Sequence, residues 1–173
     1  MKFNLLISCA IVIFSLLALT GCVPRYTLNG SAINYDVYKT VDIGQFPIRA
    51  ALVYPPLQQT FENELLNYVT RNTRLQEIDS NSADLKLEGE ITGYSLSPQA
   101  VGTDAYATET RLTITVHVKY TDNKNPANNI DQSFSAYRQF DASLMLTDVQ
   151  DGLCQEISEE LVNLIFNATF GNW

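Results

Sequence analysis

Few side chains in this sequence of 173 residues are of the types that carry out chemistry. The single histidine, His117, lies in a stretch of alternating apolar and polar residues. Its neighbours in sequence supply neither a nucleophile nor an acid that would orient it as a general base. There is no Cys/His cluster, no glycine-rich phosphate loop and no HExxH motif. These observations favour a non-enzymatic protein that uses no cofactor and no metal ion.

Cys22 is the exception, because it directly follows an uncharged apolar segment. Residues 5–19 would form a helix of roughly 22 Å, too short for a bilayer core of about 30 Å, and Lys2 precedes them as in a secretory signal. The tetrapeptide Leu19-Thr20-Gly21-Cys22 resembles the bacterial lipobox. In that motif a diacylglycerol is attached to the cysteine thiol, the signal is cut before the cysteine, and the new amino terminus is acylated. An ordinary signal peptide with an incidental cysteine is the alternative.

The lipobox resemblance implies where the mature chain resides. Residues 1–21 would be a lipoprotein signal peptide, and Cys22 would carry three acyl groups. A single acyl chain binds a membrane only marginally, so three would hold the protein there permanently. Val23, in place of Asp, favours the outer membrane, so we expect a lipid anchor on its periplasmic side. We expect residues 22–30 to form a short lipidated tether and residues 31–173 to form one domain.

The charge of the mature chain limits its partners. Its 152 residues include ten basic and nineteen acidic side chains, a net charge of −9. This sign excludes a typical nucleic-acid binder and also disfavours electrostatic attachment to an anionic bilayer. Cys154 is the one remaining cysteine, so no intramolecular disulfide forms. Because it lies in an apolar helical stripe, we expect a buried thiol rather than a reactive one.

Two segments have the apolar periodicity of helices. Residues 57–74 place Phe61, Leu65, Tyr68 and Val69 on one stripe. Residues 148–168 follow Thr147, which with Gln150 resembles a capping box. The predicted stripe of this second helix contains Val149, Leu153, Ile157, Leu161, Leu164 and Ala168.

Strands are predicted from period-two alternation. A first strand is expected within residues 39–46, and a second begins at Leu85 and bends at Gly93 before a loop over residues 98–108. The clearest strand is the segment "TRLTITVHVKYT", and a turn over residues 122–129 leads to a returning strand. That strand should place four side chains in the core: Ile130, Phe134, Ala136 and Phe140.

The elements predict an α+β fold. Each strand has one apolar and one polar face, and each helix has one apolar stripe. The economical arrangement is a two-layer α/β sandwich, with two helices packed on one face of a mixed sheet of about four strands. The other face of the sheet would be polar and left uncovered by this chain.

Three basic side chains are candidates for contacts with phosphate groups on that polar face. Lys86, Arg111 and Lys119 could form a small basic patch there. The alternative, which we favour, is that they pair across strands with Glu88 and Glu90.

Several stretches together resemble the LptE family of lipopolysaccharide-assembly lipoproteins in its Bacteroidetes-like form. The order of elements matches over nearly the whole mature chain. The stretches are "TRLQEIDSNSADLKLEGEITGYSLSP", "RLTITVHVKYTDNKNP", "QSFSAYRQFDAS" and "IFNATFGNW".

This resemblance implies a non-enzymatic role. Such proteins plug a large outer-membrane β-barrel, help it to assemble, and assist delivery of lipopolysaccharide to the cell surface. A one-to-one complex with that barrel would be expected, and lipopolysaccharide itself is an implied ligand. Two alternatives stay open: a periplasmic lipid-binding carrier lipoprotein, with Phe61, Tyr68, Phe134 and Phe140 lining a cavity, and a secretin pilotin.

Overall fold

The computed structural model describes residues 33–52, 54–100 and 107–171. The predicted signal peptide, Cys22 and the tether lie outside these residues. No helix in the described part combines the length and apolarity that a membrane crossing requires. The elements in chain order are β1 (Thr40–Ile43), α2 (Pro56–Asn72), β2 (Gln76–Glu77), β3 (Leu85–Ala100), β4 (Ala107–Asp122), the 3-10 helix η1 (Pro126–Asn128), β5 (Ile130–Asp141) and α3 (Leu146–Thr169).

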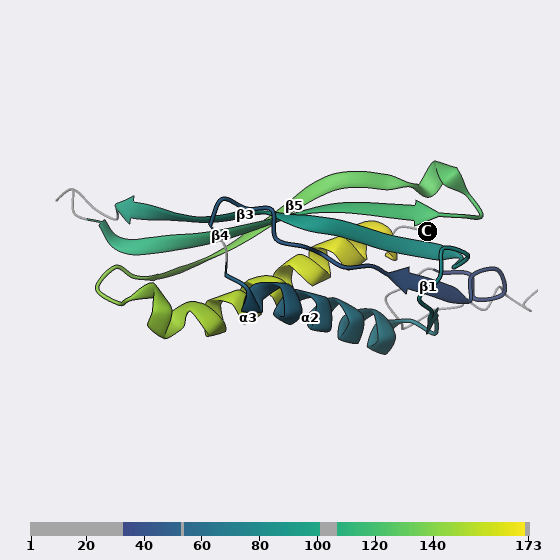
Figure 1. Ribbon diagram of the computed structural model, residues 1–173, viewed down its shortest axis with the longest axis horizontal. Coiled ribbons are helices and arrows are strands. Elements are labelled where there is room, and N and C mark those ends of the chain that lie inside the picture. Colours follow the sequence, from purple (N-terminus) through teal and green to yellow (C-terminus); the bar gives the residue numbers. More distant parts are fainter. Residues whose placement is uncertain (1–32, 53, 101–106, 172–173) are drawn as a thin grey trace, which may run out of the picture.

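The five strands form one mixed sheet in the order β2-β1-β3-β4-β5. β1 is parallel to both β2 and β3, whereas β3, β4 and β5 form an antiparallel meander. Both helices lie side by side on the same face of the sheet (Figure 1). The predicted α+β sandwich is therefore confirmed, and the strand beyond the predicted four is the two-residue β2.

β4 shows the predicted alternation over most of its length. Five of its side chains are at most 1% exposed: Leu112, Ile114, Val116, Val118 and Tyr120. They point toward the helices, and the residues between them point to the other face. The bend predicted at Gly93 is a shift in the register with β4, where a Cβ would lie 2.9 Å from that of Thr115.

The loop predicted over residues 98–108 is shorter than expected, because β3 extends to Ala100 and β4 begins at Ala107. Pro98 lies inside β3, opposite Thr110. Proline is tolerated here because β1 ends near the start of β3, which leaves this part of β3 at an edge of the sheet where no N–H is needed.

The helices cover the apolar side of the sheet. α2 buries Leu57, Phe61, Leu65 and Val69, close to the predicted stripe. In α3 the prediction of Leu164 in the core is wrong: Leu164 is 41% exposed, and Ile165 and Phe166 are buried instead. The buried stripe runs from Ile157 through Leu161 to Ile165 in steps of four residues. The prediction instead took a step of three, from Leu161 to Leu164.

The predicted capping box at the start of α3 is also wrong. α3 begins at Leu146 after Met145, and no side chain caps its first turn. The Gln150 amide reaches away from the helix start and donates a hydrogen bond of 2.5 Å to the Tyr94 hydroxyl. Gln150 therefore joins α3 to β3.

The turn predicted over residues 122–129 is organised by one buried carboxylate. Asp122 is 1% exposed and accepts hydrogen bonds from the Asn128 amide and from the backbone N–H groups of Lys124 and Asn125. It also accepts a hydrogen bond of 2.9 Å from the Tyr38 hydroxyl, which precedes β1. Asp122 thus connects the β4–β5 turn to the amino-terminal part of the domain.

The alternation in β4 gives a direct test of the fold. Val116→Asp should lower the free energy of unfolding by about 4 kcal/mol or more, because it buries an unpaired carboxylate. Thr115→Asp adds the same charge on the other face and should cost less than about 1.5 kcal/mol, near the value of its lost hydrogen bond to Ser135. Urea unfolding measures both, and equal destabilisation would contradict the described register.

Candidate functional site

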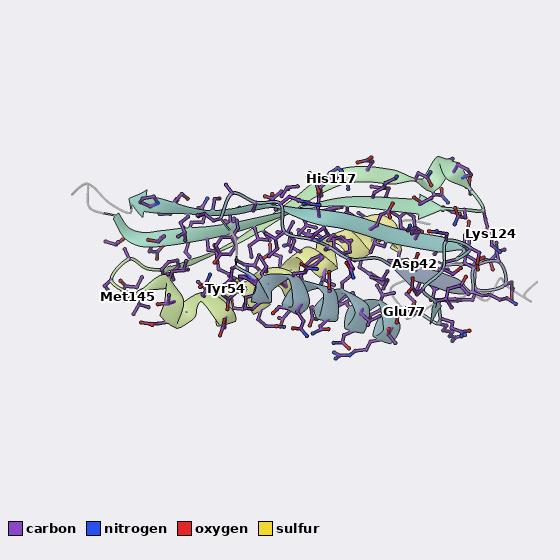
Figure 2. The ribbon with its side chains drawn as sticks, viewed as in Figure 1. Asp42, Tyr54, Glu77, His117, Lys124 and Met145 are labelled. Atoms are coloured by element: carbon purple, nitrogen blue, oxygen red, sulfur yellow. The ribbon has the colours of Figure 1, made fainter. Side chains whose placement is uncertain are left out.

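The candidate site is the face of β3, β4 and β5 that points away from the helices, here called the open face (Figure 2). His117 lies near its centre and is flanked by hydroxyl and carboxylate side chains of the neighbouring strands. In an antiparallel sheet, side chains directly opposite one another are close enough to interact. The register therefore determines which polar groups meet on this face.

Cross-strand hydrogen bonds join β4 to β5. The hydroxyl oxygens of Thr115 and Ser135 are 2.7 Å apart. His117 Nδ1 lies 3.3 Å from the Ser133 hydroxyl, and its Nε2 lies 3.0 Å from a carboxylate oxygen of Asp131. Of the two non-catalytic interpretations of His117 that the sequence allows, a solvated or a cross-strand-paired imidazole, the structure shows the second.

These three groups are the types found in a Ser-His-Asp triad, but the geometry differs. The His117 side chain is 39% exposed on an open surface. A triad works in an enclosed site beside a preformed oxyanion hole. Here the imidazole bridges two residues of one neighbouring strand, β5.

The structure brings together two of the three predicted basic residues. Lys86 Nζ lies 3.0 Å from Glu88, and Lys119 Nζ lies 3.8 Å from the other oxygen of the same carboxylate. The hydrogen bond to Glu88 raises the pKa of Lys86, against the lowering effect of partial burial. Glu90 lies 3.9 Å from Arg49, which the sequence did not identify. The favoured cross-strand pairing therefore describes Lys119, whereas Lys86 pairs with Glu88 within β3.

Arg111 lies apart from these lysines. It is eight positions before Lys119 in β4, about 27 Å away along the strand. Its guanidinium stacks over the Tyr137 ring at 4.1 Å from the ring centre, and its Nε is buried without a hydrogen-bond partner. Tyr137 was not among the predicted site residues. The predicted inward positions Phe134 and Ala136 imply an outward Tyr137 by alternation, but pairing it with Arg111 required the register of β4 and β5.

Cys154 is 1% exposed and lies beneath Tyr94. Burial raises the pKa of its thiol to about 11; a hydrogen bond with Tyr94 acts in the opposite direction, and the charge of Asp151 adds to the increase. Thiols react as thiolates, so this site is unreactive near neutral pH. The structure confirms the predicted burial of the Cys154 thiol.

Comparison with known proteins identifies the family. The LptE family model, described as lipopolysaccharide-assembly, matches residues 38–169. The chain belongs to the LptE family. Among curated proteins, none matches the chain. The match covers all the strands and helices described above, so family membership rests on the whole domain.

Solved structures similar to this LptE-family chain support its fold. A minor lipoprotein from Acinetobacter baumannii is 20% identical, with a TM-score of 0.53 over 79% of this chain and 95% of that protein. A hypothetical protein from Chlamydia trachomatis is 12% identical, with a TM-score of 0.53 over 78% of this chain and 99% of that protein. At these identities the likeness extends to the fold alone.

The burial of Cys154 predicts slow thiol chemistry. A chain lacking residues 1–21 and carrying Cys22→Ser has Cys154 as its only cysteine. Its reaction with Ellman's reagent at pH 8 should be at least about a hundredfold slower than in denaturant, because a pKa near 11 rather than 9 depletes the thiolate. The same chain with Cys154→Ala and the exposed Asn163→Cys should react rapidly. Equal reaction rates for the Cys154 chain and the Asn163→Cys chain, both folded, would contradict the burial of Cys154.

Proposed function

We propose that this LptE-family protein is an outer-membrane lipoprotein that plugs a β-barrel translocon, helps to assemble it, and so assists delivery of lipopolysaccharide to the cell surface. The family establishes a role in lipopolysaccharide assembly. The observation that carries the finer proposal is the one-sided sheet: both helices cover one face, and the other presents a row of polar side chains.

A barrel lumen is a suitable environment for this open face. Interiors of outer-membrane barrels are polar and wet, whereas their outer surfaces are apolar. The hydroxyls of Thr115, Ser133 and Ser135 and the ionic groups around Glu88 can exchange hydrogen bonds with such a wall or with its water. A non-catalytic role agrees with the cross-strand pairing of His117.

The anchor would keep the domain close to such a barrel. We propose residues 1–21 as the signal peptide, Cys22 as the acylated residue and residues 22–30 as the tether, ahead of the single domain 31–173. This places the domain on the periplasmic side of the outer membrane. The net charge of −9 favours enclosure by protein over contact with anionic headgroups.

The packing of the aromatic residues disfavours the lipid-carrier alternative. Phe61 is fully buried in an edge-to-face contact with Phe46, their ring centres 5.1 Å apart. Tyr68 makes a similar contact of 5.0 Å with Phe166. These rings, proposed as the lining of a carrier cavity, are in contact with other core side chains.

Direct contact with lipopolysaccharide is a further part of the proposal. Of the three candidate residues, Arg111 is the best placed, because its guanidinium stacks on Tyr137 and is not held by a carboxylate among the described residues. Lys86 and Lys119 are partly neutralised by Glu88 and are weaker candidates.

The decisive experiment is purification of the tagged lipoprotein from outer membranes in mild detergent. We expect a large β-barrel of the lipopolysaccharide-export type at a one-to-one ratio, identified by mass spectrometry. The exposed Ser135→Trp change on the open face should reduce recovery of the barrel. Asn163→Trp, exposed on the opposite side in α3, should leave it unchanged. Recovery of a secretin, or of the lipoprotein alone, would reject the plug proposal.

The anchor is tested separately by metabolic labelling with palmitate. The wild-type chain should incorporate label and lose residues 1–21. Cys22→Ala should abolish labelling and leave the precursor uncleaved, because the alanine offers no thiol for the lipid. Label that persists on the alanine variant would show that Cys22 is not the anchor.

A further inference from the structure

A cleft of about 510 Å³ lies at the β1 end of the sheet. Its lining includes Asp42 from β1, Lys86 and Glu88 from β3, and Asp79 and Asn81 from the loop between β2 and β3. Asp42 is in register with Lys86, and both lie on the side of the sheet opposite Val41 and Leu85, which are in the core. The cleft is therefore part of the open-face side of the sheet.

Asp42 is the unusual member of this lining. Asp42 is only 7% exposed as a residue, and it lines the wall of the cleft. Within residues 33–52, 54–100 and 107–171, no hydrogen-bond donor reaches the carboxylate of Asp42 or that of Asp79. The oxygens of Asp42 are not among the fully buried side-chain atoms without a partner, so the buried residue presents its carboxylate to the space of the cleft. There it can accept a hydrogen bond from a cationic donor that enters from outside.

The lining shows which kind of cation fits. The described part of the chain contains no group of three or more His, Cys, Asp or Glu residues arranged to hold a metal ion. The Lys86 ammonium, by contrast, already lies in the cleft, 3.0 Å from Glu88 and 3.2 Å from the Asn81 amide oxygen. Lys86 interacts with Asp42 only at longer range. The lining therefore already accommodates an ammonium group, which directs the inference toward ammonium and guanidinium donors.

We infer that this cleft receives a guanidinium or alkylammonium group, carried by an arginine or lysine side chain of the protein that covers the open face. The volume of the cleft accommodates such a side chain, and Asp42 and Asp79 provide the carboxylates that would pair with it. Charge complementarity specifies the partner's chemistry: a basic residue must project toward β1. Only the identity of this partner depends on the proposed function.

The test uses the full mature lipoprotein in neutral detergent at low salt, with N-acetylarginine amide as the probe. Saturable shifts are expected in the backbone amide resonances of Gly44, Asn81 and Lys86. N-acetylcitrulline amide has nearly the same shape without the charge and should cause none. Loss of one charge-assisted hydrogen bond should weaken arginine binding about tenfold in Asp42→Asn and in Asp79→Asn. Asp79 is exposed, so Asp79→Asn should fold normally. It therefore tests the role of the carboxylates in arginine binding even if Asp42→Asn folds poorly.

Glu109→Gln is the matched control, since it removes the same charge ten residues before Lys119 in β4 and should bind arginine normally. Three results would overturn the inference: no shift with arginine, equal affinity in Asp42→Asn and Glu109→Gln, or Mg²⁺ or spermidine binding more tightly than arginine in an Asp42-dependent manner. The titration contains no barrel. Its failure therefore rejects the cleft without rejecting the plug, and failure of the barrel purification leaves the titration standing.

Discussion

The structure depends on the one-sided burial of β4. This strand is paired on both edges, yet only one of its faces is covered by helices. The covered face is uniformly apolar, and side chains such as Ile114 and Val116 have no access to water. Such burial fixes the register, because a slip of one residue would exchange the two faces. The positions of His117, Lys119 and Arg111 on the open face follow from the same register.

On the open face, most charged side chains form ion pairs with neighbouring side chains. Glu88 is shared by Lys86 and Lys119, Asp131 contacts His117, and Glu90 faces Arg49. Exposed pairs of this kind contribute roughly 0–1 kcal/mol each, so their main effect is on what the surface offers to partners. Charged groups without an ion pair among the described residues include the guanidinium stacked on Tyr137 and the carboxylates of Asp42 and Asp79 near β1.

Alternation and helical periodicity predicted the sandwich because burial on one side imposes both patterns. They failed where a local pattern had a competing tertiary role: Gln150 contacts Tyr94 instead of capping α3, and Leu164 is exposed. For the candidate site, the sequence predicted that one face of the sheet would be polar and uncovered, but not which side chains meet on it. The cross-strand partners His117 and Asp131 required the register, and the importance of Asp42 required the loop after β2, which has no periodic signal.

The length of the β3–β4 hairpin has a geometric consequence. Each strand has 16 residues, and at about 3.3 Å per residue the hairpin extends roughly 50 Å. The apolar band of an outer-membrane barrel is only about 25 Å tall. In the proposed plug, a hairpin aligned with the axis of the barrel would be longer than this band is tall. Under that proposal, a single hairpin is long enough to act as a spacer across the full height of the band.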